Sequence, residues 1–148
     1  AKVPDAQYWI VGEGDHRAAL ESETKSLGLG DHVKFLGFRA GREKMEILRQ
    51  TRVLAYTSPK EGWGLSVIEG GALGIPSVAS DSPGLRESVP HADVPALAAR
   101  LIDLLSNEEL WWRMGERAIE WAGEFSWDRA AHETKTLAEE AITTWKSR

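Results

Sequence analysis

The strongest constraint on the fold is a strand, a glycine-bearing loop and a short helix that follow one another between residues 53 and 74. The apolar run 53–56 predicts the strand, Gly62 and Gly64 lie in the loop, and the helix is expected to end near Gly74. Glycines let a backbone approach a ligand closely, and the first turn of a helix has free N–H groups. This arrangement is typical of an anion-binding site.

Two glutamates, Glu61 and Glu69, flank the loop with seven residues between them. Carboxylates do not bind phosphate, so we expect them to accept hydrogen bonds from the hydroxyl groups of a sugar beside the anion. Both residues also have structural interpretations. Ser66 and Glu69 fit a capping box, in which each side chain bonds the backbone N–H of the other residue. Glu61 fits a solvated loop carboxylate.

Strand-like and helix-like patterns alternate along the first half of the chain. Strands are predicted at 6–11, 33–37, 53–56 and 77–79, and helices at 15–27, 42–50 and between the glycine loop and Gly74. This alternation predicts an α/β fold with a Rossmann-like, doubly wound parallel sheet and helices on both faces. Ligands of such sheets bind at the carboxyl ends of the strands, where loops 12–14 and 61–66 are expected.

The last third of the chain is predicted to be helical. Asp93 is expected to cap one helix, Ser106 or Asn107 to start a second, and Ser126 to open a third that ends near Trp145. Apolar residues of the second helix follow a period near 3.6 and are assigned to the core. The pair Trp127 and Trp145 is expected to dock the last helix, and some of that surface is expected to be exposed without its partner domain.

Composition narrows the class of protein. The 148 residues are 42% hydrophobic and 28% charged, which suits a single domain (1–148) with a helical C-terminal part (93–148). A net charge of −5 argues against nucleic-acid binding. There is no cysteine, and the four histidines lack metal-ligand spacing, so we expect no metal site and no cofactor. No apolar run approaches the roughly 18 residues of a membrane span. The compartment is left open, and the cytoplasm is taken as the default.

Three segments of the sequence are similar to those of a known family. They are EGWGLSVIE at 61–69, ALGIPSVAS at 72–80 and GLRESV at 84–89. Together they resemble glycosyltransferase family 4, the group 1 glycosyltransferases, which are retaining enzymes of the GT-B architecture. The similarity extends from about Tyr8 to the last helix. It implies that this chain is their C-terminal, donor-binding domain.

The resemblance implies a role for each candidate residue. Glu69 would accept hydrogen bonds from ribose hydroxyls, and Glu61, the proposed catalytic-site residue, would contact the transferred sugar near the leaving bond. The other candidate donor-binding residues are Gly62, Trp63, Gly64, Leu65 and Ser66 at the diphosphate, Gly12 and Gly14 after the first strand, and Phe35 and Leu36 at the nucleobase.

Some of these positions have a second interpretation that the sequence leaves open. Gly12 and Gly14 also fit a simple turn, because the third glycine of a dinucleotide-binding motif is missing. Phe35 equally fits a core strand residue. The side chain of Trp63 is expected to pack under the loop.

For the whole chain, the resemblance implies the donor-binding domain of a retaining glycosyltransferase. Such an enzyme moves a sugar from a nucleotide-diphosphate donor, UDP- or GDP-linked, to an acceptor hydroxyl. It also implies that the first βα unit and the N-terminal acceptor domain lie outside the 148 residues. The N-terminal domain is then the expected partner, the chain alone is expected to be inactive, and exposed sheet edges would permit a homodimer. The alternatives are a non-catalytic nucleotide-sugar-binding module and an excised structural domain of the same fold.

Overall fold

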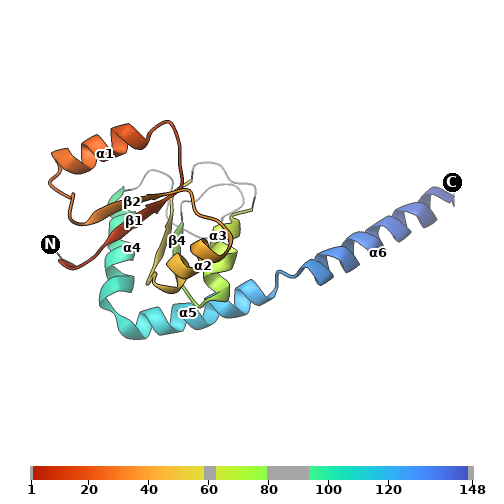
Figure 1. The fold of residues 1–148 in the computed structure, drawn as a ribbon. Coiled ribbons are helices and arrows are strands. Elements are labelled where there is room, and N and C mark those ends of the chain that lie inside the picture. The colour runs from red at the N-terminus through yellow and green to blue at the C-terminus, as the bar shows by residue number, and fades with distance from the viewer. Residues whose placement is uncertain (1, 59–62, 80–93, 147–148) are drawn as a thin grey trace.

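A computed structural model describes residues 2–58, 63–79 and 94–146. The elements in chain order are β1 (Tyr8–Val11), α1 (Arg17–Ser26), β2 (Val33–Gly37), α2 (Gly41–Arg49), β3 (Leu54–Tyr56), α3 (Leu65–Ala72), β4 (Ser77–Ala79), α4 (Val94–Ser106), α5 (Glu108–Gly123) and α6 (Trp127–Lys146). Strands and helices alternate up to β4, and three helices follow (Figure 1). The predicted order of elements is confirmed.

The strands form parallel pairs. β1 pairs with β2, with Tyr8 opposite Val33, and β3 pairs with β4, with Leu54 opposite Ser77. The predicted α/β class with parallel strands is therefore confirmed. One feature differs from the prediction: the described strands form two two-stranded sheets and not one continuous sheet, because β1 and β3 are not hydrogen-bonded to each other.

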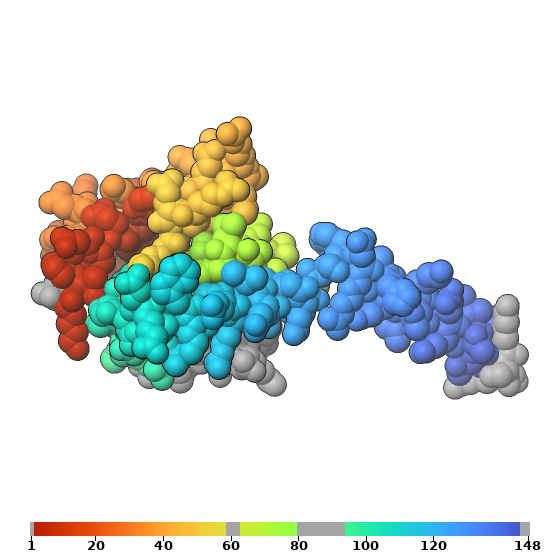
Figure 2. All heavy atoms as spheres, turned by 90° about the horizontal axis from the view of Figure 1, so that it is seen from below, coloured from red at the N-terminus to blue at the C-terminus, as the bar shows by residue number. Residues whose placement is uncertain are grey.

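The core surrounds helix α3. This helix contacts β3 and β4 on one side and α5 on another, while α4 contacts β4 and α5. Seen from below, α4 and α5 lie in the foreground, and α3 stays visible beside them (Figure 2). The most buried apolar residues of the described chain are Leu48, Ile75, Pro76, Val78, Ala79, Leu104 and Ala122.

Glycines allow α3 and α5 to approach each other at backbone distance. A Cβ atom on Gly71 of α3 would lie 3.0 Å from the carbonyl oxygen of Ala118 on α5. A Cβ atom on Gly115 of α5 would lie 2.6 Å from the carbonyl oxygen of Gly74, just after α3. Real Cβ atoms do not tolerate the shorter distance, so Gly115 is required for this packing.

Two helix starts predicted from the sequence are confirmed by their caps. The Asn107 side chain accepts a hydrogen bond from the backbone N–H of Leu110 at 2.9 Å and so begins α5. The Ser126 hydroxyl accepts one from the N–H of Arg129 at 3.1 Å at the start of α6. Both bonds satisfy donors that the first turn of a helix leaves free.

Trp127 and Trp145 do not dock the last helix onto the described residues, and docking against a partner domain stays a prediction. Their exposed fractions are 84% and 78%, and α6 projects away from the body of the molecule (Figures 1 and 2). Within the described residues, α6 has no extended packing against another element. Its polar side chains pair along the helix itself, as in the contact between Arg129 and Glu133 at 2.8 Å.

We expect Gly115→Ala to lower the free energy of unfolding by about 1–3 kcal/mol, the usual cost of overpacking. The matched control is Gly123→Ala in the same helix, where nothing lies within 4 Å of the new Cβ. This change is expected to raise stability by up to about 1 kcal/mol, because alanine favours helix over glycine. Urea unfolding measures both, and equal effects would contradict the close approach of the helices.

Candidate functional site

Helix α3 begins with free donors directly after a left-handed glycine. Gly64 is the N-cap, with φ 65° and ψ 45°, and its carbonyl oxygen accepts a hydrogen bond from the N–H of Val67 at 2.8 Å. The N–H groups of Leu65 and Ser66 have no acceptor among the described residues. Free N–H groups and the positive end of the helix dipole both favour an anion at this point.

Glu69 lies one turn further along α3 and forms an ion pair with Lys44 of α2. The contact joins the Glu69 Oε2 atom to the Lys44 ammonium. The Oε2 atom is shielded from solvent and accepts no hydrogen bond, although 38% of the Glu69 side chain is exposed. The ammonium of Lys44 is therefore its charged partner within the described part of the chain.

The capping-box interpretation of Ser66 and Glu69 is wrong. A capping box needs the serine at the N-cap, outside the helix. Gly64 occupies that position, no side chain caps the helix, and Ser66 is the second helical residue. The left-handed conformation of Gly64 starts the helix earlier than the Ser-x-x-Glu pattern suggests, and Glu69 faces Lys44 instead.

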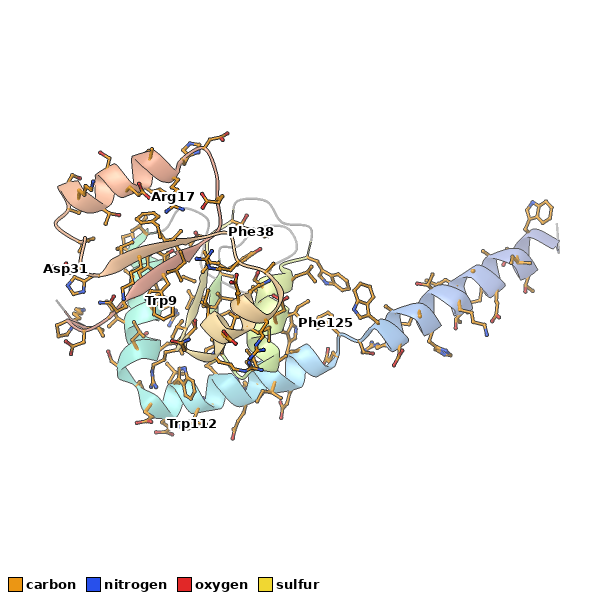
Figure 3. The ribbon with its side chains drawn as sticks, viewed as in Figure 1. Trp9, Arg17, Asp31, Phe38, Trp112 and Phe125 are labelled. Carbon is orange, nitrogen blue, oxygen red and sulfur yellow. The ribbon has the colours of Figure 1, made fainter. Side chains whose placement is uncertain are left out.

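A second group of candidate residues meets at the carboxyl ends of β1 and β2. The Gly12 N–H donates to the Gly37 carbonyl oxygen at 2.9 Å, which holds the loop after β1 against the end of β2. Arg17 donates to Glu13 Oε1 at 2.7 Å, and its guanidinium lies 5.8 Å from the centre of the Phe35 ring. Figure 3 shows Arg17 between α1 and the β1–β2 pair.

Gly14 and Leu36 belong to the same region but have local roles there. The carbonyl oxygen of Gly14 accepts a hydrogen bond from the N–H of Arg17 at 3.1 Å, so this glycine turns the chain into α1. Leu36 is a half-buried residue of β2. Helix α2 connects this group to α3. It starts at Gly41 soon after β2, and its residue Lys44 forms the ion pair with Glu69.

Trp63 stands at the entrance to α3 and is 51% exposed. Its ring contacts the ring of Phe125 edge to face, with 5.9 Å between the ring centres. Phe125 lies just beyond the end of α5. A hollow of 580 Å³ adjoins it, lined by Leu65 of α3 and Trp127 of α6 among other residues. The tryptophan thus lines this hollow together with residues of α3 and α6.

Two predicted residues, Glu61 and Gly62, lie outside the described residues, and their roles stay predictions.

Sequence reasoning also missed two side chains. Arg17 could have been noticed, since its carboxylate partners Glu13 and Glu21 stand four positions before and after it. Nothing local in the sequence relates Lys44 to Glu69. None of the helices in the described ranges combines the length and the apolar character of a membrane-spanning segment.

We expect Gly64→Ala to destabilise the chain by about 1–2 kcal/mol, the cost of a left-handed backbone for a residue with a Cβ. Gly64→Asn should cost less, because asparagine tolerates this conformation. Gly14→Ala is the control: its φ is not positive and nothing lies within 4 Å of the new Cβ. Urea unfolding compares the three, and equal stability of the two alanine variants would contradict the conformation of Gly64.

Comparison with known proteins places the chain in a family. A family model described as glycosyl transferases group 1 matches residues 1–121. N-acetyl-alpha-D-glucosaminyl L-malate synthase of Bacillus anthracis is 33% identical over 125 residues, which is 78% of this chain and 32% of that protein. D-inositol 3-phosphate glycosyltransferase of Corynebacterium efficiens is 34% identical over 126 residues, or 79% of this chain and 30% of that protein. The chain spans about a third of the length of these relatives.

Solved structures share the fold. Sucrose-phosphate synthase from Thermosynechococcus elongatus matches with a TM-score of 0.81 and 25% identity, over 97% of this chain and 40% of that one. Anabaena HepE in complex with UDP and glucose matches with a TM-score of 0.75 and 22% identity, over 98% and 41%. The fold is that of a domain of GT-B glycosyltransferases, as the sequence predicts. Because the family model covers most of its residues, this chain belongs to the group 1 glycosyltransferases.

Proposed function

We propose that this chain is the donor-binding part of a retaining glycosyltransferase that moves a sugar from a nucleotide diphosphate to an acceptor hydroxyl. The observation that carries the proposal is the start of α3, where the left-handed Gly64 precedes the free N–H groups of Leu65 and Ser66. Family membership supports it, as do similar structures named as complexes with UDP, such as HepE with UDP and glucose and the pneumococcal O-GlcNAc transferase GtfA with UDP and GlcNAc. We therefore take a uridine diphosphate sugar as the first donor to test.

The chemistry of such a transfer needs a site that stabilises the leaving group. The bond from the anomeric carbon to the diphosphate oxygen breaks, its electron pair stays on the diphosphate, and the acceptor oxygen bonds to the same face of the sugar. N–H dipoles that are already oriented stabilise the charge that develops on the diphosphate. In this chain, the N–H groups of Leu65 and Ser66 are fixed at the positive end of α3 and would serve this purpose.

The two glutamates orient the donor in this proposal, and neither needs to carry a proton. Glu69 accepts a hydrogen bond from the ribose, a charge-assisted contact. Glu61, outside the described residues, contacts the hydroxyls of the transferred sugar. In this proposal the nucleobase binds at the end of β2, beside Phe35 and Leu36. The loop with Gly12 and Gly14 lies against this strand end.

The acceptor side of the reaction needs more than these residues. The relatives are about three times as long as the matched region, and a GT-B enzyme binds its acceptor with a second domain. We propose that this N-terminal domain is the partner of the chain. The chain alone is then expected to bind the donor without turnover, and the two domains together to transfer the sugar.

The test is binding calorimetry of the chain with UDP, GDP and ADP, each with and without an attached hexose. We expect UDP to bind, and Glu69→Ala to weaken it by about 1.5–3 kcal/mol, the worth of a hydrogen bond to a charged group. Glu61→Ala should weaken only the hexose-bearing form. Glu116→Ala, at an exposed glutamate of α5, is the matched control and should change nothing.

Two results would contradict the proposal. One is a well-folded chain that binds none of these ligands at millimolar concentration. The other is a Glu69→Ala variant that binds UDP as tightly as the unchanged chain does.

A further inference from the structure

One ion pair in the described part of the chain differs from the others. Seven of the eight join residues three or four positions apart, while the pair between Lys44 and Glu69 joins two helices. Both side chains are largely covered, with 27% of Lys44 and 38% of Glu69 exposed. Solvent screens such a pair less than it screens the exposed pairs along α6.

The two carboxylate oxygens of Glu69 have different surroundings. Oε2 is shielded from solvent, accepts no hydrogen bond and faces the ammonium of Lys44. A buried charged oxygen without a partner is costly, so the ammonium holds this oxygen in place. Oε1 is not one of the buried side-chain atoms that lack a partner, and no described residue donates a hydrogen bond to it. Among the described residues, one oxygen of Glu69 is thus held and the other has no donor.

We propose that Lys44 is a positioning residue for the nucleotide site: by holding Oε2 of Glu69, it directs Oε1 toward a ribose hydroxyl of the bound nucleotide. This inference rests on the proposed function. A carboxylate that is fixed before binding loses little conformational entropy when the ligand arrives, and its hydrogen bond then contributes more to affinity. Without the ammonium, the carboxylate of Glu69 would be drawn toward water.

The positioning role differs from a purely structural one in what it does to ligand preference. A lysine that only ties α2 to α3 would affect all nucleotides alike. A lysine that orients Glu69 affects the recognition of the ribose hydroxyls and leaves diphosphate binding intact. A nucleotide without these hydroxyls therefore separates the two roles.

The experiment measures the affinities of UDP and 2′,3′-dideoxy-UDP by calorimetry in the unchanged chain and its variants, with the GDP pair if guanosine is the base that binds. The unchanged chain should prefer the ribose form by about tenfold or more, as expected for a charge-assisted hydrogen bond. Lys44→Met, which keeps the aliphatic stem, should lose most of this preference and bind the dideoxy form as before. Glu69→Gln should lose it as well, and the double variant should lose no more.

Further variants control for folding and for charge. Lys44→Arg keeps a cation and should restore part of the preference. Lys44→Gln serves in place of Lys44→Met if that variant does not unfold cooperatively. Lys135→Met removes the lysine of an exposed pair on α6, where Nζ lies 3.8 Å from Glu139, and should keep the full preference.

The possible failures are distinguishable. If Lys44→Met keeps the preference for ribose, or weakens both nucleotides equally, the positioning role is overturned while the proposed function stands. If UDP binds with no preference that depends on Glu69, the assignment of Glu69 to the ribose fails, and the inference fails with it. If none of UDP, GDP and ADP binds the unchanged chain, the proposed function itself is overturned.

Discussion

The structure depends on the packing of one short helix that would not form by itself. Helix α3 has eight residues and includes two buried glycines, Gly70 and Gly71. Each glycine costs about 1 kcal/mol relative to alanine in a helix, so local preference opposes this element. Its contacts with α5 and with β3 and β4 stabilise it instead. The direction in which its free N–H groups point is therefore set by the core of the domain.

Helix α3 also connects the two groups of candidate residues, the start of α3 and the carboxyl ends of β1 and β2. Its first turn presents the N–H groups of Leu65 and Ser66, and its second turn presents Glu69. Through Lys44, Glu69 connects to α2, which follows the strand end where Gly12 and Phe35 meet. The proposed ligand carries a diphosphate, a ribose and a base in that order. The N–H groups of α3, the carboxylate of Glu69 and the end of β2 follow one another in the same order. Rigid elements that hold such groups before binding reduce the entropy lost on binding.

Much of this could be predicted from the sequence, because the signals were local. The four strands and most helix ends were placed within about two residues, and Asn107 was one of two candidates for the start of α5 because of its residue type. Features that depend on distant parts of the chain were not. The division of the described strands into two sheets and the pair between Lys44 and Glu69 both arise from contacts, or missing contacts, between segments remote in sequence. The capping box failed because the backbone angle of Gly64 decides where α3 starts.

The most direct test of the account is a nuclear magnetic resonance titration of the ¹⁵N-labelled chain with UDP. The account predicts that the largest shifts in amide resonances occur at Leu65 and Ser66, with smaller ones at Gly12 and Phe35 and none along α6. Shifts confined to α6, or no shift at Leu65 and Ser66 when UDP is bound, would contradict the claim that the start of α3 binds the diphosphate.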